Sequence, residues 1–413
     1  MPEGVVVIGA GPAGLAAATE LRRRGVEEVV VIERESEPGG IPRHANHTGF
    51  GIRDLRRVMS GPRYARRLAE LARRSGAELR LETMVTEWGD DRRLWVTGPD
   101  GREELRPAAV VLATGCRERP RAARLVPGSR PAGVMTTSTL QQLVYLQRRT
   151  VGRRAVVVGA EHVSFSAIAT LAHGGASTAA LVTELERHQS LAAFRVGAAL
   201  RYRAPVLTRT AVTRIDGSER VTGVELTELD SGKTEMVGCD LVVFTADWIP
   251  DHELAVMAGA ELDPGTRGPR VDAGLRTTLP GVFAIGNVAH PAETADVCAL
   301  GGRHVAAAVV AHLGGEEWRP KIPVVAEPPL RWVAPNLISP GEGEPLRGRF
   351  LLRSDRFLRG PRLEALQDGR GLWGGRLRRL VPGRSAGIAA AWASRVDPDG
   401  GAVTIRVASA PPR

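Results

Sequence analysis

The sequence has very little cysteine. Its 413 residues include three, Cys116, Cys239 and Cys298, and none of them belongs to a C-x-x-C pair. This spacing excludes a redox disulfide between neighbouring thiols, and it provides no cysteine cluster for zinc or an iron–sulfur centre. We therefore expect no metal site.

Long apolar runs and a leader segment are missing as well. No apolar run reaches the roughly 18 residues that a transmembrane helix needs. The first strand signal begins at Val5, which leaves no room for a signal peptide. We therefore expect a soluble, cytoplasmic protein with no membrane span.

Lysine is scarce. The formal net charge is +10, but Lys233 and Lys321 are the only lysines, so arginine supplies almost all of the positive charge. Acidic residues are interspersed among the arginines, and there is no basic tail and no basic stripe with interleaved aromatic residues. The charge indicates a general arginine bias, and we expect no nucleic-acid partner.

The first forty residues do contain a pattern, that of a dinucleotide site. The β-branched run Val5–Ile8 leads into Gly9-Ala-Gly11-Pro-Ala-Gly14, and an Ala- and Leu-rich helical stretch follows. In this strand, loop and helix Gly9 allows the tight turn, Gly11 the close approach of a pyrophosphate, and Gly14 the packing of helix on strand. The helix N-terminus adds unpaired N–H groups and a positive dipole end for the phosphates.

A second strand at Val29–Ile32 ends in Glu33. A carboxylate about twenty residues after the glycine loop accepts the hydroxyls of a ribose without a 2′-phosphate. Strand, loop, helix, strand and acid all occur in register. We therefore interpret the segment as a nucleotide site and not as a glycine-rich turn without a ligand.

The loop at residues 39–51 is rich in glycine, proline and polar residues, so we expect no regular element there. Arg43, His44 and His47 give it the chemistry to bind an acid or to move a proton. The alternative is that these side chains cap or anchor the loop.

The next residues predict the rest of an α/β domain. The expected elements are an amphipathic helix at 64–75, strands at 78–81, 84–88 and 94–97, a buried strand at 109–112 that ends in the turn Ala113-Thr114-Gly115, and a linker at about 120–133.

A second nucleotide-fold pattern begins at Arg154. The strand 154–158 leads into Gly159-Ala-Glu161-His-Val-Ser164, and a helix and a strand at 180–184 follow. Register with the first copy puts Glu161 where the pyrophosphate-facing glycine belongs and Ser164 where the packing glycine belongs. A side chain at Glu161 fills the approach path, and its charge repels phosphate. Glu184 keeps the position of the ribose acid, but we expect a retained fold that does not bind NAD(P) in the usual pose.

Later segments return to the first domain. Strands are expected at 221–226 and 240–245, and the run 277–287 predicts a return strand. The stretch HPAETAD follows, and Thr294 is a plausible N-cap for an apolar helix that reaches about His312.

From about Gly314 the sequence changes character. Short alternating runs at 349–352, 363–366, 372–380 and 403–407, with turns at Asp368-Gly369 and at 398–400, predict hairpins in a small β-rich C-terminal domain. Trp373 and Trp392 are expected in its core.

The order of these signals resembles the flavoproteins with two dinucleotide-binding domains, of the pyridine nucleotide-disulfide oxidoreductase type. GAGPAG with Glu33, the ATG turn, the second nucleotide fold and TLPGVFAIGN carry the resemblance over residues 1 to about 313. It implies an α/β fold with two Rossmann-like domains. Residues 1–118 and 248–313 would form the FAD domain, 119–247 an inserted NAD(P)-binding-like domain, and 314–413 the β-rich domain.

The resemblance implies FAD as the cofactor. In the family the first glycine loop and its acid hold the adenosine diphosphate of FAD, and the residue at the position of Asn287 contacts the ribityl chain. The family usually has Asp there, and Asn can still hydrogen-bond a hydroxyl. The helix that begins near Thr294 would direct its positive end at the flavin. The implied FAD contacts are Gly9, Gly11, Pro12, Ala13, Gly14, Glu33, Arg34, Gly40, Val85, Ala113, Thr114, Gly115, Gly286, Asn287, Thr294 and Ala295.

A narrower resemblance rests on residues 39–44, the altered second loop and HPAETAD. These segments are similar to the FAD subunits of heteromeric opine and amino-acid dehydrogenases and of hydrogen cyanide synthase, which oxidise a carbon–nitrogen bond and pass electrons to partner subunits. Many of these relatives continue into a cysteine-rich iron–sulfur domain. Residues 314–413 contain no cysteine, so an iron–sulfur relay would lie on another polypeptide or be absent.

The expected function is an FAD-dependent dehydrogenase or oxidase subunit that acts on an amino acid, opine or related small acid and passes electrons to a partner protein. Arg43 would bind a substrate carboxylate, and His44 or His47 would take a proton. Two alternatives stay open. One is an NAD(P)H-dependent reductase of a redox protein, which Glu161 and the missing cysteine pair weaken; the other is a non-catalytic assembly subunit with structural FAD.

Overall fold

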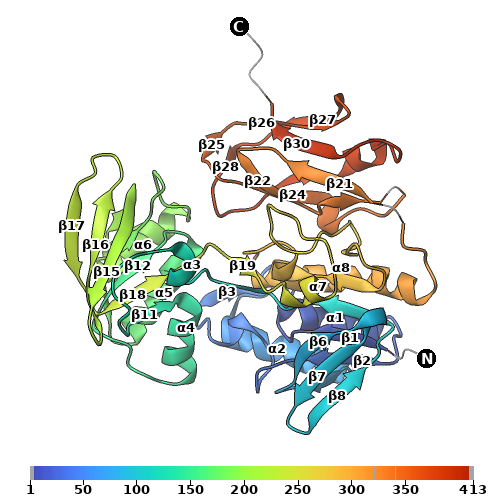
Figure 1. Ribbon diagram of the computed structural model, residues 1–413, viewed down its shortest axis with the longest axis horizontal. Coiled ribbons are helices and arrows are strands. Elements are labelled where there is room, and N and C mark those ends of the chain that lie inside the picture. The colour runs from blue at the N-terminus through green and yellow to red at the C-terminus, as the bar shows by residue number, and fades with distance from the viewer. Residues whose placement is uncertain (1–3, 320, 340, 409–413) are drawn as a thin grey trace. The chain divides into compact units, whose positions relative to one another are not determined.

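The computed structural model describes residues 4–319, 321–339 and 341–408. The chain forms two compact units: the first contains the residues up to 43, residues 48–116 and the chain from 250 onward, and the second contains residues 44–47 and 117–249. Figure 1 draws both.

The first unit is built on a five-stranded parallel sheet in the order β20-β9-β1-β2-β5. Its strands are β1 (Val5–Ile8), β2 (Val29–Ile32), β5 (Glu78–Arg80), β9 (Ala109–Leu112) and β20 (Val282–Ala284). Every residue of β1, β2, β9 and β20 is buried. Such continuous apolar strands need a layer on each face of the sheet.

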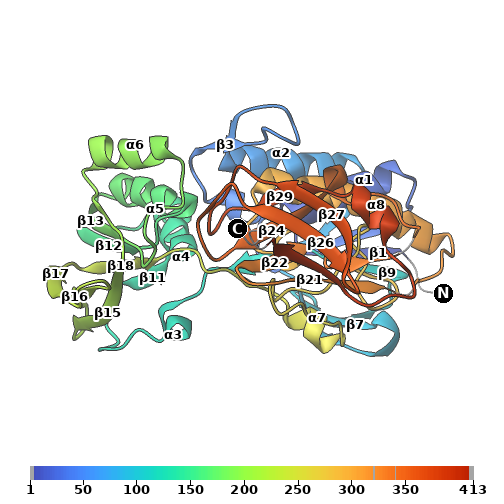
Figure 2. The same ribbon diagram turned by 90° about the horizontal axis from the view of Figure 1, so that it is seen from above.

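Alternate residues of each strand point to opposite faces of the sheet, so they pack into two different cores. Val5 and Val7 face a core shared with α1 (Pro12–Arg23), α2 (Gly61–Arg74) and α8 (Ala295–Leu313), which lie together in Figure 2. Val6 and Ile8 face the opposite core, which includes side chains of β6 (Met84–Trp88) and β7 (Leu94–Gly98). With β8 (Gly101–Leu105) these strands form an antiparallel sheet. The loops at the carboxyl ends of β1, β2 and β9 therefore meet at one edge.

The second unit repeats this plan. Its parallel sheet has the order β11-β18-β12-β13-β14 and one face covered by α5 (His162–His173). The other face packs on the antiparallel sheet of β15 (Thr210–Gly217), β16 (Val221–Glu228) and β17 (Thr234–Gly238). Figure 2 shows the two layers on opposite sides of the sheet. The remaining elements are β11 (Val134–Thr136), β12 (Arg154–Val158), β13 (Ser177–Val182), β14 (Val206–Leu207), β18 (Leu241–Phe244), α3 (Arg121–Arg124), α4 (Thr137–Gln141), the π-helical turn η3 (Gln142–Leu146) and α6 (Ala192–Tyr202).

Short elements connect these layers. They are η1 (Ile41–Arg43), β3 (Thr48–Phe50), β4 (Met59–Ser60), η2 (Asp90–Arg92), β10 (Cys116–Arg117), β19 (Ile249–Pro250), α7 (Glu253–Met257) and η4 (Gly286–Val288). The loop at 39–51 thus contains a 3-10 turn and a three-residue strand, where the composition predicted no regular element. No described helix is both long enough and apolar enough to cross a membrane.

The β-rich C-terminal part of the first unit has its own core. Side chains from the sheet β23-β21-β30-β26-β27 and from the sheet β22-β24-β29 share one apolar cluster. Trp392 is 2% exposed in it and the half-buried Trp373 packs against it, which confirms their prediction as core. The elements are β21 (Ile322–Ala326), β22 (Leu330–Ala334), β23 (Leu337–Ile338), η5 (Leu346–Gly348), β24 (Arg349–Ser354), β25 (Leu358–Arg359), β26 (Arg362–Gln367), β27 (Arg370–Arg376), β28 (Arg379–Leu380), β29 (Ala386–Ala389), η6 (Ala391–Arg395) and β30 (Val403–Val407).

Of the two predicted hairpin turns, one is confirmed and one is wrong. Asp368 and Gly369 both have positive φ and join the antiparallel pair β26 and β27. The turn at 398–400 follows η6 and leads into β30, whose partners are β21 and β26. A Pro-Asp-Gly signal fixes where the chain bends, but not which strands pair after the bend.

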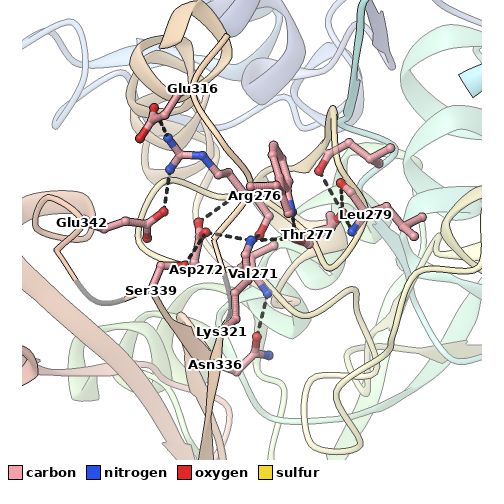
Figure 3. A network of polar contacts seen from close by, with 12 residues as sticks. Val271, Asp272, Arg276, Thr277, Leu279, Glu316, Lys321, Asn336, Ser339 and Glu342 are labelled. Carbon is pink, nitrogen blue, oxygen red and sulfur yellow. Dashed lines mark hydrogen bonds and ion pairs between the residues drawn. The ribbon is translucent and has the colours of Figure 1, made fainter. Parts of the chain in front are cut away.

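A polar network joins the β-rich part to the rest of the first unit (Figure 3). Lys321 Nζ lies 2.8 Å from Asp272 Oδ2, and Arg276 forms ion pairs with Glu342 (2.7 Å) and Glu316 (2.9 Å). Three acids thus share two cations. Burial, together with the Asp272 carboxylate, raises the pKa of Glu342.

Candidate functional site

The first glycine loop, residues 9–14, leaves an open space at one position. A Cβ on Gly9, whose φ is +109°, would lie 2.5 Å from the carbonyl oxygen of Ala113, and a Cβ on Gly14 would overlap the carbonyl oxygen of Gly9. At Gly11 a Cβ would meet nothing within 4 Å. Gly11 is also the N-cap of α1, with no side-chain cap and no acid in the first turn. The helix amides beside this space are therefore available to an anion.

Glu33 is fixed beside the loop. Its side chain follows β2 and is 9% exposed. Oε2 accepts a hydrogen bond from the backbone N–H of Ala10 at 2.8 Å, and Oε1 accepts from the N–H of Glu35 at 3.0 Å. A carboxylate oxygen accepts more than one hydrogen bond, so Glu33 keeps capacity for ribose hydroxyls.

Other predicted FAD contacts surround the same edge. Gly40, with φ +59°, lies against Gly11, because a Cβ there would come 3.0 Å from Gly11 Cα. Pro12 and Ala13 begin α1. Two predicted contacts are less suited: Arg34 is exposed, and the side chain of Val85 is buried in the core, so Val85 could contact a ligand only through its backbone.

The ATG turn is anchored on both sides. The N–H of Ala113 donates to Ile8 O at 2.9 Å. Thr114 Oγ1 donates to Asp251 O at 2.7 Å, and Gly115 has a φ of +80°. This turn places Ala113 beside the first glycine loop.

The return segment adds the last group of predicted contacts. A Cβ on Gly286 would lie 2.9 Å from Ala13 Cβ, so the segment passes close to α1. Asn287 Oδ1 accepts from the N–H of Glu293 at 2.8 Å, and its Nδ2 donates to Glu293 O at 3.3 Å. Its amide retains one proton and one lone pair for a ribityl hydroxyl.

Thr294 occupies the N-cap position of α8, as predicted, but its hydroxyl makes no capping bond to the helix backbone. It donates instead to the carboxylate of Asp296, which also forms an ion pair with Arg53 at 3.2 Å. The helix amides near Ala295 receive no cap from Thr294.

These groups fit FAD. The open space at Gly11 and the uncapped start of α1 suit a pyrophosphate, and the Glu33 carboxylate suits a ribose. FAD, when bound, supplies the acceptor for hydride or electrons.

Arg43 belongs to the first unit, whereas His44 and His47 belong to the second. Arg43, in the first unit, donates to Glu37 O at 2.5 Å and lies 3.7 Å from the Glu37 carboxylate. His44, in the second unit, is 5% exposed, and its Nδ1 lies 3.4 Å from Gln141 Oε1. His47 is exposed. Their catalytic roles stay a prediction.

The second glycine loop, residues 159–164, is filled by its own side chains. Glu161 is 9% exposed, and its Oε1 accepts hydrogen bonds from Ser164 Oγ at 2.9 Å and from Thr245 Oγ1. Ser164 Oγ in turn accepts from the N–H of Glu161 at 3.3 Å. The start of α5 is therefore closed by a carboxylate and two hydroxyls from the chain itself.

A second buried acid lies near this loop. Glu118 is 4% exposed, and its Oε2 accepts from the N–H of Ser138 at 2.7 Å. Burial raises the pKa of Glu118 to about 7, and the Glu161 charge adds to the rise. Burial also raises the pKa of Glu161, against the hydrogen bonds from Thr245 and Ser164. Glu118 carries no signal in the sequence, because it is a lone acid at the edge of an expected linker.

Comparisons with known proteins agree with this architecture. The profile of a family described as pyridine nucleotide-disulphide oxidoreductase matches residues 3–314. A ferredoxin–NADP reductase of Salinispora tropica is 30% identical over 319 residues, which are 74% of this chain and 92% of that protein. The hydrogen cyanide synthase subunit HcnB of Pseudomonas aeruginosa is 37% identical over 142 residues, 33% of this chain and 29% of that protein. The crystal structure of T. acidophilum thioredoxin reductase matches with a TM-score of 0.63 at 21% identity, and the match covers 76% of this chain and 99% of that chain.

These similarities confirm four predictions from the sequence: the resemblance itself, the two-domain dinucleotide-binding fold, an oxidoreductase, and FAD as the cofactor.

Proposed function

Because this chain belongs to the pyridine nucleotide-disulphide oxidoreductase family, we propose that it is an FAD-dependent dehydrogenase or oxidase subunit. It oxidises an amino acid, an opine or a related small acid, and it passes the electrons to a partner protein. The flavin is reduced by this substrate and not by a pyridine nucleotide.

The closed second glycine loop is the observation that supports this proposal. A dinucleotide needs the helix amides and the space that Glu161 Oε1, Ser164 and Thr245 occupy. When ionised, Glu161 also repels a phosphate; when protonated, it still fills the approach path. Either state leaves the first loop as the one favourable dinucleotide site of the two.

The absence of a neighbouring cysteine pair removes the disulfide chemistry that the family is named after. An electron donor bound directly at the flavin remains. The similarity of part of the chain to a hydrogen cyanide synthase subunit supports a substrate with a carbon–nitrogen bond and a function within a heteromeric enzyme.

The residues proposed for the reaction lie in the loop after β2. Arg43 would bind a substrate carboxylate once it leaves Glu37, because its guanidinium forms paired hydrogen bonds with carboxylates. His44 or His47 would accept the proton of the substrate amine. We expect His44→Ala and His47→Ala to keep FAD bound, and at least one of them to slow flavin reduction by substrate about a hundredfold.

An anaerobic titration tests the proposal. Purified protein loaded with FAD is mixed with NADH, with NADPH, and with a panel of amino acids and opines, and the visible absorbance of oxidised flavin is followed. Bleaching by an amino acid or opine, with none by either pyridine nucleotide, is the expected result. Rapid bleaching by NADH or NADPH would contradict it.

A second candidate is an NAD(P)H-dependent reductase of a redox protein. Two observations favour it: the ferredoxin–NADP reductase relative is matched over 92% of its length, and the second unit has a pocket lined by Arg187, His188 and Arg195. The same titration separates the two candidates, because this one requires flavin reduction by NADH or NADPH. No bleaching by any compound would favour the assembly subunit with structural FAD.

A further inference from the structure

A buried ion pair connects the β-rich part of the first unit to the segment that precedes α8. Arg353 on β24 has a side chain 8% exposed, and Glu293 has one 11% exposed. Arg353 Nη2 lies 3.9 Å from Glu293 Oε1 and donates to Ala292 O at 2.7 Å. The β-rich part thus binds both the backbone and the carboxylate of this segment.

The surroundings of Arg353 hold its charge in place. Its guanidinium carbon lies 5.3 Å from the centre of the Trp332 ring, in a cation–π contact. Ser385 Oγ donates to the Glu293 carboxylate and lies 3.4 Å from Arg353 Nη2. Burial lowers the pKa of Arg353, but a guanidinium remains charged at neutral pH. A charge and its partner are therefore both removed from bulk water.

Glu293 connects this ion pair to a predicted flavin contact. The backbone N–H and C=O of Glu293 bind both polar atoms of the Asn287 side chain. An Asp at 287 would lose the donor to Glu293 O and would add a second carboxylate near Glu293. The contacts of Glu293 thus suit an amide at position 287 better than a carboxylate.

We propose that Arg353 is a positioning residue of the flavin site. Through Glu293 it holds Asn287 in place, and it balances the buried negative charge of Glu293 next to that predicted flavin contact. The β-rich part is then a component of the redox site as well as a domain attached to it. The proposal rests on the FAD site described above.

The ion pair has an electrostatic consequence that a purely structural contact lacks. Two-electron reduction of FAD adds negative charge to the flavin, so nearby charge changes its reduction potential. Removing Arg353 leaves the carboxylate of Glu293 unbalanced and disfavours reduction. Removing the charge of Glu293 leaves the guanidinium unbalanced and favours reduction. The two substitutions should shift the potential in opposite directions.

The test compares the full-length variants Arg353→Met, Arg353→Lys, Glu293→Gln and the double variant Arg353→Met with Glu293→Gln. Glu342→Gln is the matched control, because Glu342 belongs to the other polar network between the same two parts (Figure 3), where its carboxylate pairs with Arg276. Each protein is measured for its FAD dissociation constant and, at pH 8, for its flavin potential by equilibration with a reference dye.

We expect Arg353→Met to weaken FAD binding about tenfold and to make the potential more negative, since one charge-assisted contact is lost. Glu293→Gln should make the potential more positive. The double variant should have a reduction potential closer to that of the wild type than either single variant. Arg353→Lys keeps the positive charge, so its potential should stay close to the wild-type value. Glu342→Gln should change neither the potential nor the FAD dissociation constant. If Arg353→Met does not fold, Arg353→Lys and Glu293→Gln still carry the test.

Shifts of Arg353→Met and Glu293→Gln in the same direction, or no shift in either, would overturn the proposal while the FAD site stands. A wild-type protein that takes up no FAD would overturn the FAD site and this proposal together. Reduction of the wild-type flavin by NADPH would overturn the proposed function. The potentials of the same variants would still test the role of Arg353, because they do not depend on which compound reduces the flavin.

Discussion

The two glycine loops of this chain occupy the same place in the same supersecondary structure, yet one is open and the other is closed. In the first loop nothing lies within 4 Å of a Cβ at Gly11, and α1 starts without a side-chain cap. In the second loop Glu161 stands at the equivalent position and binds Ser164 and Thr245. The same strand, loop and helix therefore form in both units, although side chains fill two of the three glycine positions in the second loop.

The two helices α1 and α5 also differ in which groups bind their first backbone amides. α1 leaves them for a ligand, so the first site is completed only by an anion. The start of α5 is completed from within the chain, at the cost of burying an acid. The two loops thus share one topology but differ in what can meet the first helix amides, an external anion at α1 and side chains of the chain itself at α5.

The largest expected effect is on FAD affinity, when position 11 of the first loop receives the glutamate that the second loop has at position 161. Gly11→Glu places a side chain and a charge in the open space, and we expect FAD affinity to fall about a hundredfold or more. Gly11→Ala, which adds only a methyl group, should lose less. Flavin content after purification and a titration of apoprotein with FAD measure both. A Gly11→Glu protein that retains FAD would show that the open space is not the pyrophosphate site.

The next effect concerns Glu118, the buried acid near the second loop. The pKa of Glu118 is raised from 4.5 to about 7. Its contribution to stability is complete below about pH 4.5 and is lost as the pH rises through about 7, a change of about 3 kcal/mol. Glu118→Gln should flatten the pH dependence of thermal unfolding, and Glu184→Gln, at an exposed acid of the same unit, should not. Equal pH profiles for wild type and Glu118→Gln would contradict this account.

A smaller effect is expected at the acid that both copies retain. Glu33→Gln keeps the side-chain shape and the bond to Ala10 but removes the charge that strengthens hydrogen bonds to ribose, so FAD affinity should fall about tenfold. Glu35→Gln is the control at a neighbouring exposed acid. FAD titrations of the two variants decide the point. Equal affinities would place the ribose elsewhere.

The smallest effect is a gain. Glu161→Gly combined with Ser164→Gly should open the second loop, and weak binding of adenine dinucleotides should appear, with a dissociation constant of about 1 mM. Glu161→Gln, which removes the charge but keeps the volume of the side chain, should not bind these dinucleotides. Calorimetry with NADH and NADPH measures both. Binding by Glu161→Gln alone would mean that charge, and not filled space, closes the loop.

The sequence was informative wherever the signal is local. Gly9, Gly11 and Gly14 predicted the first loop, and β1, β2 and β9 occupy the expected residues, because apolar runs and glycine spacing act within one supersecondary unit. The contrast between Gly11 and Glu161 was likewise visible from register alone.

Contacts between distant segments could not be predicted. Nothing in the sequence near Arg353 indicates that it reaches Glu293, since the pair depends on how two sheets of the β-rich part pack on the segment before α8. The predicted hairpin at 398–400 was wrong for the same reason, because the partners of a strand depend on the packing of the whole sheet. Buried ion pairs and sheet order are properties of tertiary packing and leave no periodic signal.

The most direct test of the contrast between the loops is a calorimetric titration of the FAD-loaded wild-type protein with NADH and NADPH, with ATP and ADP as further ligands. No heat of binding from any of the four, in a protein that retains its FAD, is the result expected from an open first loop and a closed second loop. Saturable binding of NADH or NADPH at micromolar concentration would contradict it.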